Sequence, residues 1–178
     1  MLLGSREEFG IELFLEEDLM PPSAIWGRMR VWVEDHSFGD FDDPHCALYP
    51  AYDRFSDLIK NIDKLYEPDF INLDPDECYR RVDESIYGKY VDDELVDSEF
   101  EQYSDKYSKH DFLTNWGEMF DSTIKPFIFR QEKDHMIVFQ PDPWSGKIKS
   151  YRCSVEVFLK VVKQFKSWFE EKTKELEA

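Results

Sequence analysis

The sequence predicts an α+β fold, in which an antiparallel sheet formed by N-terminal and C-terminal strands packs with helices, including a long C-terminal amphipathic helix. Near the N-terminus, apolar and polar residues alternate with the period of a half-buried strand, and three further strand-like runs lie in the C-terminal third. In the middle and at the end, apolar residues recur at helical intervals. Strands on both sides of a helical middle are typical of α+β proteins. We expect residues 1–178 to form one domain, since no internal repeat divides the chain.

Two alternating runs predict the first strands. Residues 9–17 place Phe9, Ile11, Leu13 and Leu15 on one side, and residues 25–35 place Met29, Val31 and Val33 on one side. The prolines between the runs break the chain, so the strands are expected to form an antiparallel hairpin with a long connection. A third short strand is predicted in residues 45–52, ending near Pro50.

The period changes to helical after Tyr52. A helix is predicted from there to about Tyr66, with its apolar stripe formed by Phe55, Leu58, Ile59, Ile62 and Leu65. A second helix is predicted to begin with Asp74 as N-cap and Pro75 at its first position, and to end at Gly88. A short helix or loop is expected over residues 110–120.

The C-terminal third predicts three strands and one helix. Residues 126–131, 135–140 and 147–154 are strand-like runs, and the segment 141–146 has the turn chemistry of a hairpin. From Val155 onward, a helix is predicted with lysines on its polar side and an apolar stripe formed by Phe158, Val161, Val162, Phe165, Trp168, Phe169 and Leu176.

The net charge of −17, from 39 acidic against 22 basic residues, limits the partners of this chain. Such a field repels nucleic acid and anionic lipid and attracts cationic surfaces. The negative charge is concentrated in residues 63–105, which contain fifteen acidic residues and only four basic ones. With no signal peptide and no apolar run of membrane-spanning length, a cytoplasmic protein that binds neither nucleic acid nor membrane is expected.

The cysteines and histidines give no strong indication of metal or redox chemistry. Cys46, Cys78 and Cys153 have neither disulfide-framework nor zinc-site spacing, so reduced, buried thiols are expected. Residues 36–45 contain mixed His and carboxylate groups that suit several transition metals, namely His36, Asp40, Asp42, Asp43 and His45. The same segment also reads as a polar loop after a strand, and no third distant ligand is apparent.

No motif for catalysis is present. The chain contains no nucleophile elbow, no glycine-rich phosphate loop and no His-Glu-x-x-His motif. His110 and His135 stand alone in polar surroundings, where a surface imidazole is the expected arrangement. A calcium loop is excluded between Tyr90 and Trp116, because that stretch has no glycine for its sixth position. We therefore expect no enzyme activity, no catalytic residue, no cofactor and no metal.

The remaining candidate is the stretch from Tyr90 to Tyr107, in which aromatic and aliphatic residues are interspersed with acids. One interpretation is a helix with a solvated acidic face. The other is a surface for a basic partner, because interfaces favour Tyr anchors and complementary charge accelerates encounter. The acidic segment 67–107 is expected to be helical or loop-rich. Its partner-binding residues are predicted to be Tyr87, Tyr90, Asp92, Asp93, Glu94, Asp97, Glu99, Phe100, Glu101, Tyr103 and Tyr107.

The N-terminal third also resembles a known family. The runs GSREEFGIELFLEED, IWGRMRVWVEDHSFGDFDD and YDRFSDLI resemble bacterial immunity proteins of polymorphic toxin systems, of the contact-dependent growth inhibition (CdiI) type. The residues that carry the likeness are Gly4, Phe9, Ile11, Trp26 and Gly27. The resemblance implies an intracellular protein that binds and blocks a toxin domain of the CdiA type. It implies no catalytic residue, and the acidic segment departs from the family's compact pattern.

Composition and resemblance together predict an immunity protein that neutralises one cognate toxin domain. A ribonuclease is the expected toxin, because nucleases are basic and an acidic inhibitor can occlude the surface that binds their polyanionic substrate. Two alternatives remain at this stage. One is an acidic adaptor or regulatory domain for another basic protein. The other is a metal-dependent hydrolase that uses His36, Asp40, Asp42 and His45.

Overall fold

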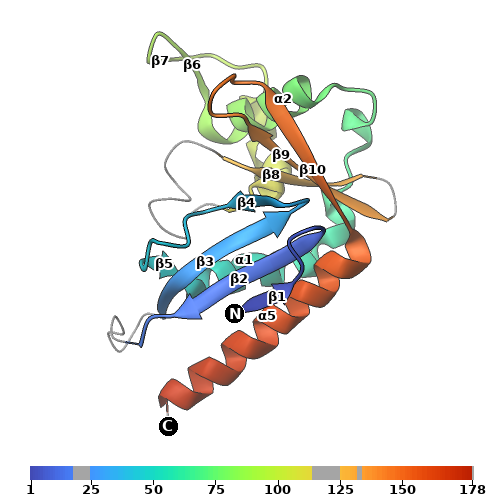
Figure 1. Cartoon of the computed structure of the whole chain (residues 1–178). Coiled ribbons are helices and arrows are strands. Elements are labelled where there is room, and N and C mark those ends of the chain that lie inside the picture. The colour runs from blue at the N-terminus through green and yellow to red at the C-terminus, as the bar shows by residue number, and fades with distance from the viewer. Residues whose placement is uncertain (18–24, 114–124, 132–133, 178) are drawn as a thin grey trace.

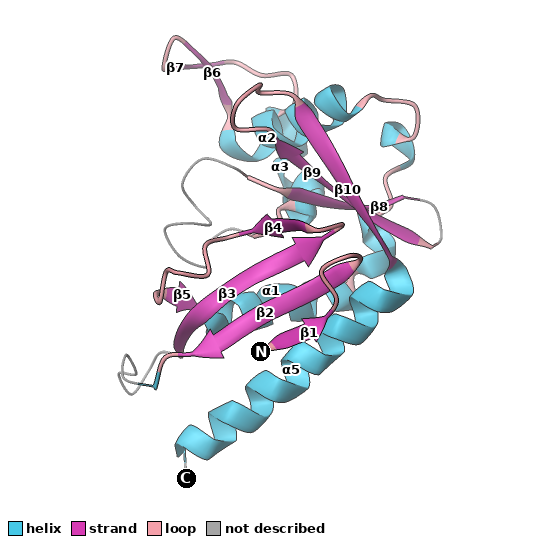
Figure 2. Ribbon diagram, viewed as in Figure 1, coloured by secondary structure: helices cyan, strands magenta, loops and turns pink. Residues whose placement is uncertain are grey.

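The computed structural model describes residues 1–17, 25–113, 125–131 and 134–177, and it confirms the α+β class. Residues 18–24, 114–124, 132–133 and 178 lie outside this description. The predicted single sheet is in fact two larger antiparallel sheets, one from the N-terminal strands and one from the C-terminal strands, with a small separate hairpin between them in sequence. Figure 2 shows the two sheets one above the other, with helices packed against each.

The first sheet consists of strands β1 (Leu2–Gly4), β2 (Phe9–Leu15), β3 (Trp26–Val33) and β4 (His36–Phe38), in that order. A short strand, β5 (Cys46–Ala47), pairs with the start of β3. The register pairs Leu13 with Met29, which places the predicted apolar faces of β2 and β3 on the same side of the sheet. The predicted hairpin is therefore confirmed.

Two helices cover the apolar face of the first sheet: α1 (Leu48–Lys60) and α5 (Val155–Glu177), seen against it in Figure 1. Phe9 of β2 packs on Phe158 of α5, with ring centroids 4.9 Å apart. Gly27 allows the close approach of α1, because a Cβ at this position would lie 2.8 Å from the Leu48 side chain. Each such buried side chain contributes about 1.5–3 kcal/mol by leaving water. The side chain of Leu176, in the predicted stripe, lies outside the described residues.

The predicted strand near Pro50 is correct only for its first residues. Strand β5 ends at Ala47 and α1 begins at Leu48, earlier than predicted. Pro50 fits within the first turn of α1, because the N–H groups of that turn have no partner inside the helix. The predicted end near Tyr66 is reached through a short 3-10 helix, η2 (Ile62–Leu65), after α1 ends at Lys60.

The second sheet contains β8 (Phe127–Gln131), β9 (His135–Pro141) and β10 (Ile148–Ser154), in the order β10-β9-β8. Helix α2 (Pro75–Tyr87) packs against it, as does the 3-10 helix η3 (Pro68–Phe70), and they form a second apolar core. The predicted ends of α2 are confirmed. The Asp74 side chain accepts a hydrogen bond from the Glu77 N–H, and Gly88 ends the helix at φ 84°. The predicted segment 110–120 lies largely outside the described residues.

Carboxylates cover much of the outer edge of β10. The backbone N–H groups of Ile148, Arg152 and Ser154 donate to the side chains of Asp76, Glu34 and Glu8 respectively. An edge strand with free N–H groups is a template for pairing with another chain, so these contacts protect it. They also tie the first sheet to the second.

The cysteine prediction is confirmed, since all three thiols are buried and free of disulfides. Burial raises the pKa of Cys78 to about 11 and that of Cys153 to about 12, so both are neutral thiols at physiological pH. Within the described residues, no helix is long and apolar enough to cross a membrane.

Candidate functional site

The stretch that begins at Tyr90 is not one helix, contrary to the helical interpretation. It forms a two-stranded hairpin, β6 (Lys89–Val91) and β7 (Glu94–Val96), followed by the short helices η4 (Glu101–Tyr103), α3 (Ser104–Tyr107) and η5 (Ser108–His110). The turn consists of Asp92 and Asp93, with φ angles of 51° and 64°. Positive φ at both central residues matches the twist of a two-residue hairpin. The sequence held a partial signal, since Tyr90 and Leu95 lie at equal distances on either side of the acidic pair.

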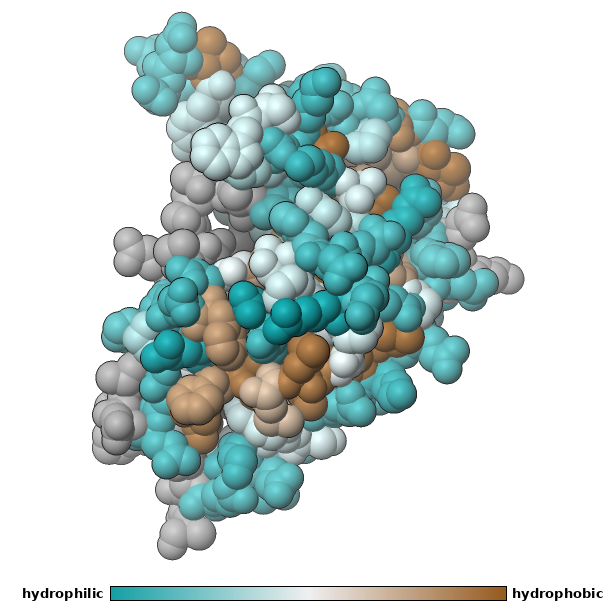
Figure 3. Space-filling model, in the orientation of Figure 1, coloured by the Kyte–Doolittle hydropathy of each residue, from teal (hydrophilic) through white to brown (hydrophobic). Residues whose placement is uncertain are grey.

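The β6–β7 hairpin projects from the body of the molecule and carries apolar side chains into solvent. Tyr90 and Leu95 are paired across the strands and are 61% and 67% exposed, and Val91 beside them is 50% exposed. Figure 1 shows the hairpin at the upper end of the molecule, and Figure 3 shows apolar side chains set among hydrophilic ones there. Exposed apolar side chains that cluster in this way mark interaction surfaces.

The carboxylates on and after the hairpin are exposed and have no side-chain partner among the described residues. Among the described residues, no side-chain hydrogen bond or ion pair involves the acidic groups of this set: Asp92, Asp93, Glu94, Asp97, Glu99 and Glu101. Their charge is therefore not neutralised by the protein itself. This set and the exposed residues Tyr90, Val91 and Leu95 are called the hairpin surface below.

The acids earlier in the segment are arranged differently. Glu67 is buried and forms ion pairs with Lys106 (3.2 Å) and Lys109. Burial alone raises the pKa of Glu67, but the His110 ring and the two ammonium groups outweigh this and hold it at about 2. Glu77 likewise forms ion pairs with Arg80 (2.8 Å) and Arg81 (2.7 Å). These acids maintain the fold.

Three aromatic residues predicted to contact a partner have structural roles. Phe100 is 7% exposed and lies beneath the guanidinium groups of Arg80 and Arg81, 4.9 Å and 5.4 Å from its ring centre. Tyr107 is 4% exposed and packs against the Phe70 ring.

The third, Tyr87, is half-buried, and its hydroxyl donates to Asp111 at 3.0 Å. Helices α2 and η3 bury Phe100 and Tyr107, so in the free protein these two rings offer a partner little surface. Tyr103, by contrast, is 40% exposed.

His110 is not a surface residue, contrary to expectation. Its ring is fully buried against Phe129, with centroids 4.4 Å apart, and Nδ1–H donates to the Ile128 carbonyl at 2.9 Å. Burial lowers the pKa of His110 and outweighs the opposing effect of the Glu67 carboxylate, which lies 3.7 Å from Nε2. His135 is exposed, as expected.

The five candidate metal ligands do not converge. His36 stacks on Tyr151 (centroids 4.2 Å apart) and shares a hydrogen bond with Gln140 at 2.8 Å. Asp40 and Asp43 accept backbone N–H groups of their own loop, from Asp42 and His45. No group of three or more His, Cys, Asp or Glu side chains positioned for a metal occurs in the described part of the chain. Residues 39–45 form a polar loop after strand β4, as in the alternative interpretation.

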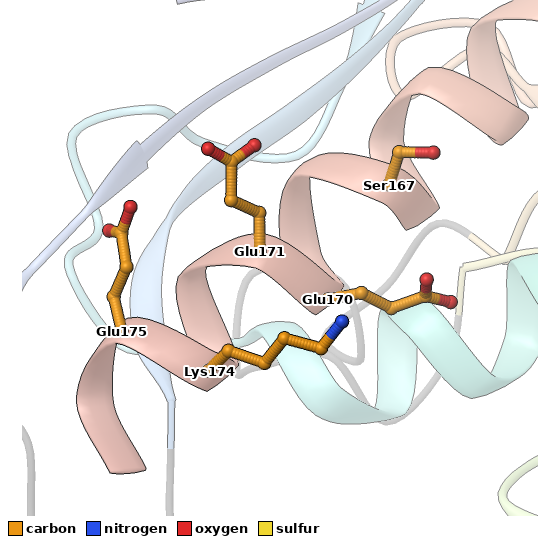
Figure 4. Close-up of a pocket in the computed structure, with 5 residues that line it drawn as sticks. All are labelled: Ser167, Glu170, Glu171, Lys174 and Glu175. Atoms are coloured by element: carbon orange, nitrogen blue, oxygen red, sulfur yellow. The ribbon is translucent and has the colours of Figure 1, made fainter. Parts of the chain in front are cut away.

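A second group of acids lies along the C-terminal half of α5. Glu170, Glu171 and Glu175 line a shallow surface hollow with Ser167 and Lys174, and Figure 4 shows that their side chains fan out from the helix without converging on one point. Glu170 accepts a hydrogen bond from the Tyr52 hydroxyl at 2.7 Å, and Glu175 forms an ion pair with Lys172. This hollow lacks the exposed apolar residues of the hairpin surface.

Comparisons with known proteins give one family match and one likeness of fold. The sequence model of Immunity protein 42 matches residues 1–168. The crystal structure of CdiI from Burkholderia dolosa AUO158 has a similar fold, with a TM-score of 0.62 over 92% of this chain and 97% of that chain, at 14% sequence identity. No curated protein matches the chain at a significant level. Since the family match spans nearly the whole sequence, the chain belongs to the Immunity protein 42 family.

Proposed function

We propose that this immunity protein neutralises a contact-dependent growth inhibition toxin domain, a basic nuclease acting on RNA, by covering the surface that binds its substrate. Immunity proteins of this type are inhibitors and not enzymes. Inhibition by binding needs no catalytic residue, cofactor or metal from this chain. The complex would form in the cytoplasm, where a delivered nuclease meets its substrate.

One observation carries the proposal, namely that unpaired carboxylates surround an exposed apolar pair on a projecting hairpin. The carboxylates would take the place of substrate phosphates against the Lys and Arg side chains of the toxin. Tyr90 and Leu95, which are more than half exposed, would supply the apolar contact area. An acidic surface without apolar anchors would accelerate association with the toxin, but the complex would dissociate quickly.

The two kinds of residue are expected to act on different rate constants. Exposed charges at the rim of an interface raise the association rate and make it depend on salt. Buried aromatic and aliphatic anchors mainly slow dissociation. The hairpin surface therefore predicts fast, salt-sensitive association that is governed by the carboxylates, and a residence time that is governed by Tyr90 and Leu95.

The test reverses three charges of the hairpin surface, with Asp92, Asp93 and Glu94 all changed to Lys. Association with an inactive copy of the cognate toxin domain should slow by about tenfold or more at low salt, and its salt dependence should flatten. Stopped-flow mixing measures both. The matched control changes Glu170, Glu171 and Glu175 to Lys, which alters net charge equally at the other end of the molecule in Figure 1.

The control separates a local effect from a general one. Equal slowing by both triple variants would mean that only net charge matters, and would remove the hairpin from the proposal. Co-expression with the active toxin gives the cellular readout, since cells that carry the control variant should survive. Total RNA from unprotected cells shows whether the toxin degrades RNA, and intact RNA would contradict the assignment of a ribonuclease.

A further inference from the structure

The connection between β9 and β10 displays a tryptophan in solvent. Trp144 is 94% exposed, more than any other large apolar side chain among the described residues. Among the described residues, no aromatic ring or cation stacks on the indole of Trp144. Trp144 belongs to neither apolar core. An indole in water adds nothing to fold stability, yet Trp is the side chain most enriched at the centres of interfaces.

The loop that carries Trp144 is fixed by its own hydrogen bonds. One oxygen of the Asp142 carboxylate accepts the N–H groups of Trp144 (3.0 Å) and Ser145 (2.8 Å), and the other oxygen pairs with Lys149. The Asp142 backbone also donates to the Lys147 carbonyl at 2.8 Å and accepts from the Gly146 N–H at 2.8 Å. Lys149, followed by the Ser145 and Trp144 donors, holds the pKa of Asp142 well below its usual range, so the carboxylate stays ionised.

This rigidity lowers the entropic cost of binding. A flexible loop loses conformational freedom when a partner orders it, whereas a loop that is already ordered loses only the rotamers of the anchoring side chain. The hydrogen bonds of Asp142 therefore hold the backbone of Trp144 in one conformation before any partner binds. The same hydrogen bonds close the turn between β9 and β10, and they leave the indole almost fully exposed.

The loop lies at the same end of the molecule as the β6–β7 hairpin. Both β6 and the β9–β10 pair contact α2, and the Ile148 N–H donates to Asp76 in the first turn of that helix. Figure 1 shows both connections at the upper end. The loop differs from the hairpin in charge, because Asp142 is neutralised by Lys149 and the nearby Lys147 is exposed.

We propose that Trp144 is a second anchor of the toxin interface, and that its indole enters an apolar pocket on the toxin while the hairpin surface meets the toxin's cationic groove. This inference rests on the proposed function. An acidic contact and an apolar contact at the same end of the molecule would also fix the orientation of the partner, because the cationic groove of the toxin favours the acidic contact over the apolar one.

The test is Trp144→Ala, measured for stability and for binding of the same inactive toxin domain. The melting temperature should be unchanged, because the side chain is almost fully exposed and belongs to neither apolar core. Dissociation should be at least about tenfold faster with little change in association, as expected for an anchor. Trp144→Phe should recover part of the lost residence time, because it restores an aromatic ring.

A second variant tests the role of the rigid loop. Asp142→Ala removes the acceptor that fixes Trp144 and should weaken toxin binding, whereas Lys149→Ala removes only the ion pair and should have a smaller effect. Equal, negligible effects of both variants would contradict the role assigned to rigidity.

The outcomes separate this inference from the proposed function. If Tyr90→Ala and Leu95→Ala weaken toxin binding and Trp144→Ala does not, the second anchor is overturned and the hairpin surface stands. If Trp144→Ala weakens binding and the hairpin variants do not, the anchor stands and the hairpin proposal fails. If none of the three changes the dissociation rate, both are overturned.

Discussion

Within the described part of the chain, most carboxylates between Glu67 and Glu84 form ion pairs with bases, whereas those between Asp92 and Glu101 face solvent without partners. In the first region, Glu67 forms ion pairs with lysines of α3 and η5, and Glu77 and Glu84 form them with arginines of α2. In the second region, no base lies within ion-pair distance of the described carboxylates. One acidic segment therefore divides into a scaffold and a display surface, and net charge by itself does not distinguish the two.

The aromatic residues follow the same division. Phe100 is buried beneath two arginines, while Tyr90, in the same acidic stretch, is mostly exposed. A buried ring stabilises the free protein, whereas an exposed one can stabilise only a complex. Mutations should therefore separate folding from binding residue by residue.

The largest expected effect is the contrast between Phe100→Ala and Tyr90→Ala. Loss of the buried ring should reduce the free energy of unfolding by about 3–5 kcal/mol, through lost burial and the cavity left behind. Tyr90→Ala should change it by less than about 0.5 kcal/mol while shortening the toxin residence time. Urea unfolding and surface binding kinetics measure the two quantities. A destabilised Tyr90→Ala variant would show that the hairpin supports the fold.

A smaller effect is expected from Glu67→Gln, which leaves Lys106 and Lys109 without a charged partner at this position. The free energy of unfolding at pH 7 should fall by about 2 kcal/mol, a value below that of a fully buried pair because Lys106 is partly exposed. Asp92→Asn, which changes an exposed and unpaired acid, is the matched control and should leave stability within about 0.5 kcal/mol of wild type.

The same variant predicts a pH dependence. The folded-state pKa of Glu67, about 2, lies below its ordinary value of 4.5, so its contribution is complete above pH 4.5 and is lost as the pH falls toward 2. The stability difference between wild type and Glu67→Gln should therefore shrink between pH 4.5 and pH 2. Urea unfolding at several pH values measures it, and a constant difference over this window would contradict the ion pairs.

The smallest expected effect comes from a double substitution in the hairpin turn, Asp92→Asn together with Asp93→Gly. Asn followed by Gly favours the positive φ angles of this turn, so the hairpin should gain up to about 1 kcal/mol of local stability. Hydrogen exchange at the Val91 and Glu94 amides should slow accordingly. Association with the toxin should nevertheless slow severalfold, because two charges are lost. Faster association would mean that hairpin order, and not charge, limits encounter.

Local signals explain why much of the fold was predictable. The Asp74–Pro75 start and the Gly88 end of α2 depend on backbone geometry within a few residues, and both are confirmed. Strands β2 and β3 follow from the alternation of apolar and polar residues, which is also local. The prediction failed where one residue pattern is compatible with two kinds of secondary structure. The acids and aromatics after Tyr90 fit a helical spacing, but the Asp92–Asp93 pair forms a turn, and turn conformation is not visible in a count of apolar positions.

The site was predictable only in part. The sequence located the acidic segment and the exposed residues Tyr90 and Tyr103, but it also assigned Phe100 and Tyr107 to the surface. Trp144 was recognised only as a turn residue, since nothing in its neighbours indicates how exposed the indole is. His110 shows the opposite error, because its polar sequence neighbours conceal a fully buried position against the rings of the second core.

The sequence by itself determined the class of elements, the ends of α2, the long C-terminal helix and the excess of negative charge, because each follows from spacing or composition along the chain. Only the tertiary structure decided which carboxylates are neutralised, which rings are buried, and that the strands form two larger sheets instead of one. The physical reason is that ion pairing and burial depend on residues far apart in sequence. Lys106 and Lys109 reach Glu67, and α2 covers Phe100, only once the chain has folded.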